Sequence, residues 1–173
     1  MEHTLVALVE DKPGVLNRVA SLFRRRTFNI ESLTVGHTHT QGVSRMTIAV
    51  TGDESQIERL TAYLYKLVNV IQVEDLSGTP CVNRDLAMIK VKATPETRTH
   101  IMQTVDVFRA RIVDVTNDSF IVEVTGDETK IEGLVDVLKP YGIIEMVRTG
   151  MVSMARGVSA NPSTGTNGNG KSH

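Results

Sequence analysis

One segment of this chain occurs twice. Residues 50–60 read VTGDESQIERL, and residues 124–134 read VTGDETKIEGL. A match of this length indicates that one structural unit is present in two copies. A division near position 80, with the polar residues 158–173 set aside, leaves halves of about 75 to 80 residues, a size at which a domain buries only a modest core. We therefore expect two small domains of the same architecture, and we expect them to have partners.

The first copy alternates strands and helices. In residues 43–50, Met46 and Ile48 fall on one face and Arg45 and Thr47 on the other, which is typical of a strand. In chain order, the patterns predict a strand at 4–9, a helix with Val15, Leu16, Val19, Ala20 and Phe23 on its apolar side, strands at 28–35 and 43–50, a helix opened by Asp53 and Gln56 as a capping box, and a strand at 70–73. This β-α-β-β-α-β order is that of a ferredoxin-like domain with both helices on one face of the sheet.

The second copy repeats the same order with a shorter hairpin. Its predicted elements are a strand at 88–93, a helix at 97–108, strands at 112–115 and 120–125, a helix at 130–138 and a strand at 143–147, with Asn117 and Asp118 in a compact turn. The predicted fold class is therefore α+β, with two tandem ferredoxin-like domains at 3–77 and 84–157. We expect a linker at 78–83 and, because residues 158–173 contain almost nothing apolar, a disordered tail there.

The composition argues against several classes of function. A net charge of −1 provides no electrostatic basis for binding nucleic acid or an anionic membrane. No apolar stretch approaches the roughly 20 residues that span a bilayer, and because no positively charged start leads into an apolar run, we expect no signal peptide. A single cysteine, Cys81, excludes an intramolecular disulfide, and no Walker loop or other catalytic motif is present. We expect a cytoplasmic protein that binds no metal or cofactor and has no catalytic centre.

A glycine-bearing loop precedes the first predicted helix, and the second copy lacks it. Residues 10–14 read EDKPG, whereas the aligned residues 92–96 read KATPE. The sharpest signal within this loop is the segment Asp11, Lys12, Pro13 and Gly14. A helix N-terminus presents unpaired N–H groups and a partial positive charge, which suit the carboxylate of a small ligand, and glycine allows that ligand to approach the backbone. Pro13 suits the first turn of the helix. The alternative is a plain turn that starts a helix.

Asn29 stands at the start of the next predicted strand. We expect this position to neighbour the exit of the first strand, where the amide would bond the ammonium or carboxylate of a ligand. The alternative is that Asn29 caps a turn.

Other polar groups favour simpler interpretations. His37 and His39 would face one side of a strand, but no cysteine or further histidine lies near them to complete a metal site. The run Arg24–Arg26 suits a helix C-terminus and is typical of a solvated face. RNA-binding versions of this fold need aromatic rings on their central strands, which here carry aliphatic and threonine side chains.

Several longer runs point to one family. They are the loop at 11–14, FNIESLTV at 28–35, SRMTI at 44–48, KLVNV at 66–70, residues 84–93, FRARIVDV at 108–115 and RTG at 148–150. In these runs the chain resembles the small, regulatory subunit of acetolactate synthase, also called acetohydroxyacid synthase. The resemblance extends from about residue 3 to Gly157, which is nearly the whole predicted ordered chain.

The resemblance implies a regulatory function. It implies that the first domain is an ACT domain, that two copies pair through their ACT domains, and that valine, or leucine or isoleucine, binds between them. It also implies a catalytic large subunit that carries thiamine diphosphate, magnesium and FAD, which this chain would activate and place under feedback inhibition. On the family pattern, the candidate effector-binding residues are Asp11, Lys12, Pro13 and Gly14 in the loop, with Asn29 and Ile30 contributed across the interface.

Two positions depart from the family pattern. Position 11 is often asparagine, and the carboxylate of Asp11 would repel an effector carboxylate and help only by facing its ammonium group. Position 27 is commonly glycine, so Thr27 makes a left-handed backbone there more costly. The alternative function is a stand-alone amino-acid-sensing ACT protein that regulates another enzyme or transcription. A small ferredoxin-like enzyme is disfavoured because no nucleophile and base stand out together.

Overall fold

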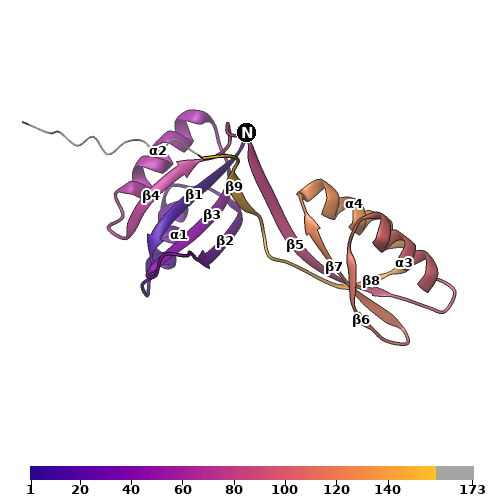
Figure 1. Cartoon of the computed structure of the whole chain (residues 1–173). Helices are drawn as coiled ribbons and strands as arrows, with labels where there is room; N and C mark the ends of the chain where they lie inside the picture. The colour runs from indigo at the N-terminus through magenta and orange to yellow at the C-terminus, as the bar shows by residue number, and fades with distance from the viewer. Residues whose placement is uncertain (159–173) are drawn as a thin grey trace, which may run out of the picture.

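The computed structural model of the chain describes residues 1–158. It consists of two α/β units in succession, each with the predicted order β-α-β-β-α-β. Figure 1 shows the two units, with the long strand β5 (Cys81–Lys92) running from one to the other. The predicted fold class, two tandem ferredoxin-like α+β domains, is confirmed.

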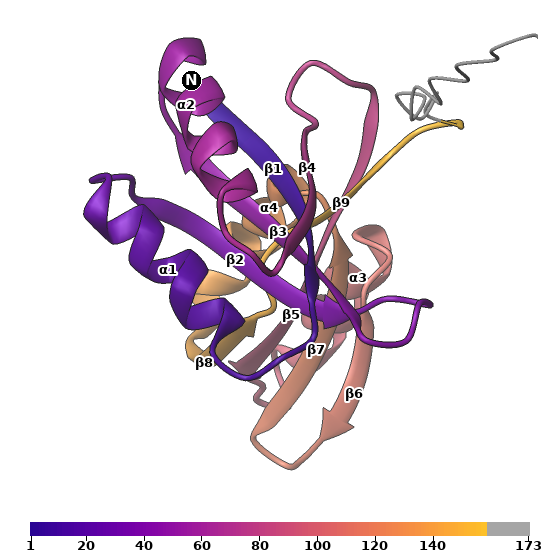
Figure 2. The ribbon, with the colours of Figure 1, turned by 90° about the vertical axis from the view of Figure 1, so that its left-hand side faces the viewer.

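The first unit is a four-stranded antiparallel sheet with two helices on one face. The sheet order is β2-β3-β1-β4, formed by β1 (Glu2–Glu10), β2 (Ile30–His37), β3 (Val43–Thr51) and β4 (Val70–Asp75). Helices α1 (Val15–Arg25) and α2 (Glu54–Tyr65) lie in front of this sheet in Figure 2, with the second unit behind it. The helix-free face of the sheet is therefore turned toward the second unit.

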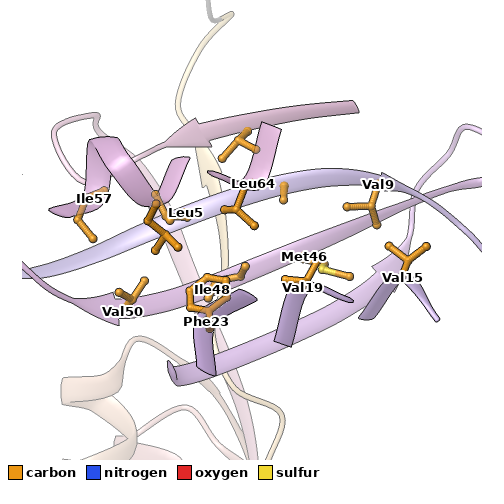
Figure 3. Close-up of a cluster of buried hydrophobic side chains, with 13 residues drawn as sticks. Leu5, Val9, Val15, Val19, Phe23, Met46, Ile48, Val50, Ile57 and Leu64 are labelled. Atoms are coloured by element: carbon orange, nitrogen blue, oxygen red, sulfur yellow. The ribbon is translucent and has the colours of Figure 1, made fainter. Parts of the chain in front are cut away.

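The apolar faces of these elements meet in one buried cluster. Figure 3 shows Val19 and Phe23 of α1 close to Ile48 of β3, with Leu5 of β1 and Leu64 of α2 in the same cluster. All five side chains are at most 1% exposed, and burying each one contributes about 1.5–3 kcal/mol. This packing holds α1, and with it the loop that precedes the helix, against the sheet.

The buried row of α1 is narrower than its spacing predicts. Val15, Val19 and Phe23 are buried, whereas Leu16 is 47% exposed. At about 100° per residue, Leu16 lies on the same side of the helix as Phe23, but it is in the first turn, at the end of the helix. Leu16 therefore belongs to the predicted apolar side without being part of the buried row.

Of the two helix starts predicted in the first unit, one differs. The capping box is confirmed, because Asp53 Oδ1 accepts from the Gln56 N–H at 2.8 Å and Gln56 Oε1 accepts from the Asp53 N–H at 2.9 Å. Pro13, in contrast, does not lie in the first turn of α1. The helix begins at Val15 with Gly14 as its N-cap, and the positive φ of 84° at Gly14 prevents the helix from extending back to the proline.

The second unit has the same plan. Its elements are β5, α3 (Arg98–Val107), β6 (Arg111–Val115), β7 (Ser119–Gly126), α4 (Glu128–Leu138), the short 3₁₀ helix η1 (Lys139–Tyr141) and β8 (Ile143–Arg148), with sheet order β6-β7-β5-β8. Asp127 caps α4 as Asp53 caps α2, accepting from the Lys130 N–H at 2.9 Å. Its own buried cluster packs α3 and α4 on this second sheet.

The chain between and after the units differs from the prediction. The expected linker at 78–83 is only partly a loop, because β5 already begins at Cys81. A further strand, β9 (Val152–Ala155), returns along the start of β5, with Cys81 opposite Ala155 and Arg84 opposite Val152. This partner, remote in sequence, extends β5 into the expected linker. Of the predicted tail, all but Val158 lies outside the described residues.

Candidate functional site

The loop from Asp11 to Gly14 leaves the entrance of α1 open. Gly14 has φ 84° and is the N-cap, and within residues 1–158 no side chain caps the helix and no acidic residue lies in its first turn. A Cβ placed on Gly14 would meet no described atom within 4 Å. The first N–H groups of a helix have no partner within the helix. The entrance of α1 therefore combines free donors, the positive end of the helix dipole and room for a ligand.

Asp11 faces the hairpin between β2 and β3. Its backbone N–H donates to the Gly42 carbonyl at 2.8 Å, and its Oδ2 lies 3.3 Å from Nδ1 of His37. Both side chains are exposed, at 48% for Asp11 and 82% for His37, so this pair contributes little to stability. In this orientation the carboxylate of Asp11 is occupied by the hairpin.

Asn69 and Arg18, which sequence reasoning did not select, hold the other side of the loop. Asn69 is 9% exposed, and its carbonyl accepts from the Glu10 N–H at 2.9 Å. Its side chain donates to Glu10 Oε2 at 3.2 Å and accepts from the guanidinium of Arg18 on α1. The sequence does contain a signal for this role, because Asn69 is a polar residue between two valines and a buried polar residue needs hydrogen-bond partners.

Lys12 also belongs to this network. Its Nζ lies 2.5 Å from Glu10 Oε2. The hydrogen bond from Lys12, followed by that from Asn69, lowers the pKa of the Glu10 carboxyl. Lys12 is thus engaged with the end of β1. The backbone N–H groups of Asp11, Lys12 and Val15 also have carbonyl partners, at 2.8, 3.0 and 3.4 Å. Within residues 1–158, the donors left for a ligand are therefore those of Gly14 and of the next two residues of the first turn of α1.

Asn29 lies at the far end of the sheet from this loop, so its expected position beside the exit of β1 is wrong. Ile30 pairs with Val50, and Val50 pairs with His3. The loop instead leaves β1 after Glu10, seven positions along the strand from His3, or about 23 Å at 3.3 Å per residue. The reason is topological, because α1 carries the chain back along the sheet before β2 begins and β3 lies between β1 and β2.

Within its own chain, Asn29 has a local partner. It is exposed, and its Nδ2 donates to Glu31 Oε1 at 2.9 Å. Ile30 is partly buried against the core of the first unit. Asn29 and Ile30 therefore form one group of candidates at the start of β2. The loop residues form a second group near the end of β2.

The backbone two residues before Asn29 adopts a left-handed conformation, at the position where the family commonly has glycine. Thr27 has φ 59° and is the residue just past the C-cap Arg26. The Phe28 N–H donates to the Phe23 carbonyl at 3.1 Å and the Thr27 N–H to the Arg24 carbonyl at 3.2 Å. This is a Schellman motif, completed by the edge contact of the Phe23 and Phe28 rings at 6.5 Å.

The remaining polar groups form no additional centre. Within residues 1–158, no three His, Cys, Asp or Glu side chains are grouped to hold a metal ion. Arg26 of the basic run stacks on the ring of Tyr63 at 3.7 Å, and Cys81 is partly buried on β5. Every helix in the described part of the chain is too short or too polar to cross a lipid bilayer.

Comparison with known proteins matches both units. The family described as AHAS small subunit-like ACT domain matches residues 5–72, and the family described as the small subunit of acetolactate synthase matches residues 84–157. The chain belongs to the acetolactate synthase small-subunit family. The resemblance seen in the sequence is thereby confirmed, and the first unit is an ACT domain.

Individual relatives agree along nearly the whole chain. The probable acetolactate synthase small subunit of Archaeoglobus fulgidus is 54% identical over 157 residues, covering 91% of this chain and 98% of that protein. The acetolactate synthase small subunit of Mycobacterium leprae is 52% identical over 155 residues, covering 90% and 92%. The crystal structure of the acetolactate synthase small subunit from Thermotoga maritima superposes with a TM-score of 0.86 at 41% identity, covering 92% of this chain and 99% of that one.

Proposed function

We propose that this chain regulates an acetolactate synthase in branched-chain amino acid biosynthesis, and that it does so as a dimer that binds valine or a related amino acid between two ACT domains. Its partner would be the catalytic large subunit, which carries thiamine diphosphate, magnesium and FAD. The chain would raise the activity of that subunit and make it sensitive to feedback inhibition.

One observation carries this proposal: the two groups of candidate residues lie at opposite ends of an edge strand. The loop at Asp11–Gly14 is near the end of β2, where His37 contacts Asp11, and Asn29 is at its start. β2 pairs with β3 on one side only. If two β2 edges pair antiparallel about a two-fold axis, the start of one strand meets the end of the other. Asn29 of each copy would then meet the loop of the other copy.

The chemistry of the combined groups suits a free amino acid. The unpaired N–H groups at the entrance of α1 would bind its carboxylate, and the side-chain oxygen of Asn29 from the second copy would accept from its ammonium group. Leu16 and Val35, which are 47% and 43% exposed at this end of the unit, offer apolar surface for a branched side chain. Because the carboxylate of Asp11 faces His37, it would be farther from the ligand carboxylate than its position in the sequence suggests.

Regulation requires that the effector bind two states of the dimer with different affinity, and such coupling is typically about 1–3 kcal/mol. A stand-alone ACT sensor is the alternative. The match of the second unit to the acetolactate synthase small subunit supports the leading proposal. Co-purification separates the two, because only the regulatory subunit retains a thiamine-dependent partner whose activity falls when valine is added.

The role of the loop in binding the effector is tested by calorimetric titration of the wild type and of Gly14→Asp with valine, leucine and isoleucine. We expect Gly14→Asp to weaken binding at least ten-fold, because a carboxylate would stand where the backbone meets the ligand carboxylate. The matched control is Gly157→Asp, since Gly157 also has a positive φ, of 73°, and a Cβ there would meet no described atom within 4 Å. Full valine affinity in Gly14→Asp would remove the loop from the site, and absence of heat with every amino acid would remove the sensor.

The dimer is tested by mixing two defective chains, Gly14→Asp and Asn29→Ala. Each variant alone would bind valine poorly. In a mixed dimer, one site combines both defects, while the other combines a normal loop with a normal Asn29. We expect valine binding to reappear, with one intact site per mixed dimer. If refolded mixtures bind no better than the separate variants, the two groups do not meet across two copies.

A further inference from the structure

A second hollow lies on the face of the first sheet that has no helices. Its volume is about 510 Å³, and its walls come from β2 and β3 on one side and from the paired strands β5 and β9 on the other. Figure 1 shows β9 returning beside β5 next to this sheet. Small-molecule sites typically occupy about 300–1,000 Å³, so the hollow has the size of a ligand site. It is separate from the entrance of α1, which lies over the opposite face.

The hollow exists because its floor is made of small side chains. Thr34, Gly36 and Thr47 lie on the helix-free face of the sheet and line the cavity. A Cβ on Gly36 would meet no described atom within 4 Å. Gly36 has no positive φ that would require glycine. A turn therefore does not require glycine at this position, and the absence of a side chain leaves space in the cavity.

The opposite wall is apolar and accessible. Val82 of β5 and Val152 and Met154 of β9 line the cavity, and Val152 and Met154 are 48% and 66% exposed. Apolar side chains lining one concave surface favour a ligand with an apolar body, since covering them removes apolar area from water.

The charged groups of the hollow are all basic. Arg45 and Arg84 line it together with His37, and no lining residue among the described ones is acidic. Arg45 donates from Nη2 to the Ser153 carbonyl at 2.6 Å. Neither arginine forms an ion pair within residues 1–158. A guanidinium has five N–H donors, so Arg45 keeps donors for an anion while it holds β9 to the sheet.

We propose that this cavity binds a small amphipathic carboxylic acid. The carboxylate lies against Arg45 at the sheet, with Arg84 adding positive charge, and the apolar body lies against Val152 and Met154. Bidentate pairing with a carboxylate is the geometry that a guanidinium favours. The site is on a different face from the proposed valine site and does not depend on it, although His37 borders both, through the cavity wall and through its contact with Asp11.

The test uses octanoate as the probe, in calorimetric titrations of the full chain. Octylammonium, which has the same apolar body and the opposite charge, is titrated in parallel. We expect one octanoate to bind per chain and octylammonium to bind at least ten-fold more weakly. Equal binding of the two probes, or no octanoate binding, would overturn the proposal.

The location is tested by Gly36→Val. This substitution fills the floor of the cavity with a side chain that strands favour, and its Cβ would meet no described atom within 4 Å. We expect octanoate affinity to fall at least ten-fold, with Gly36→Ala intermediate. Gly78→Val is the matched control, because Gly78 also has open space and lies outside the lining. Arg45→Met should lose octanoate binding without gaining octylammonium binding.

The outcomes separate this site from the proposed function. Unchanged octanoate affinity in folded Gly36→Val, judged by circular dichroism, contradicts the cavity site. Valine titrations of the same variant should match the wild type, because the entrance of α1 is unaltered. Displacement of octanoate by valine would place both ligands at one site and would also overturn the proposal.

Discussion

The two units of this protein share a fold and differ at the entrance of their first helix. In the first unit, Gly14 caps α1 in a left-handed conformation, with no side-chain cap in the described chain. In the second unit, the Thr94 N–H donates to Thr97 Oγ1 at 2.9 Å, and the Arg98 N–H donates to the Thr94 carbonyl at 3.0 Å. The two helix starts are alike in such turn bonds, because the Val15 N–H also donates to the Lys12 carbonyl, at 3.4 Å, and neither helix has a side-chain cap among the described residues. They differ in the N-cap, which is the left-handed Gly14 in α1 and the right-handed Thr97 in α3. The proposed binding of an amino acid would therefore depend on this glycine and its loop and not on the fold.

The hairpin between β2 and β3 of the first unit also differs from the hairpin between β6 and β7 of the second unit. Asp11 and Ala93 both donate a backbone N–H to the neighbouring hairpin, to the Gly42 and Asp118 carbonyls respectively, each at 2.8 Å. Only the first hairpin is long enough to add a side chain, His37, beside the loop. The hydrogen bond is common to both units, whereas the contact between His37 and Asp11 occurs beside the proposed effector site of the first unit.

The largest expected effect tests whether the two units are separate folding units. Leu60 and Leu134 occupy the same position of the repeated segment, and both are 0% exposed. Truncation of either to alanine should lower the free energy of unfolding by about 2–5 kcal/mol. We expect Leu60→Ala to shift the unfolding of the first unit only, and Leu134→Ala that of the second, as followed by differential scanning calorimetry. If both variants shift one common transition equally, the units unfold together.

A smaller effect is expected where the two units touch. Gly150 has φ 84°, and a Cβ there would lie 2.8 Å from Ser32 Oγ and 3.0 Å from Thr34 Oγ1 of β2. We expect Gly150→Ala to cost about 1–3 kcal/mol, because the contact is overpacked and the left-handed backbone is strained.

The control for Gly150→Ala is Gly157→Ala, because Gly157 has a similar φ of 73° and a Cβ there would meet no described atom within 4 Å. Urea unfolding of both variants measures the difference. Equal destabilisation would show that the backbone conformation alone is responsible, and that the contact between Gly150 and β2 adds nothing.

The smallest effect concerns a feature that both units share. Thr27 and Arg109 are the non-glycine residues with positive φ in residues 1–158, at 59° and 52°, and each follows the C-cap of the first helix in its unit. Thr27→Gly and Arg109→Gly should each stabilise the chain by about 1 kcal/mol by relieving the left-handed strain. Arg24→Gly, inside α1, should instead destabilise by about 1 kcal/mol. Thermal melts measure all three, and loss of stability in Thr27→Gly would contradict the strain at that position.

Local rules predicted most of the elements correctly. The capping box at Asp53, the alternation of Met46 and Ile48 and the order of strands and helices all depend on residues within a few positions of each other. The same rules failed where a distant partner decides the outcome. The rules place Cys81 in a linker, whereas it begins β5, because the strand that pairs with it contains Ala155 and lies more than 70 positions later. Asn29 was misplaced because strand order is set by the packing of the whole sheet.

The repeated segment, the glycine-bearing loop and the absence of a second such loop were determined by the sequence alone, because periodicity, capping and backbone freedom are properties of neighbouring residues. Only the tertiary structure decided that Asp11 faces His37, that Asn29 stands at the opposite end of β2, and that β9 closes a cavity against the first sheet. Those facts depend on strand order and register, which arise from contacts between residues far apart in the chain.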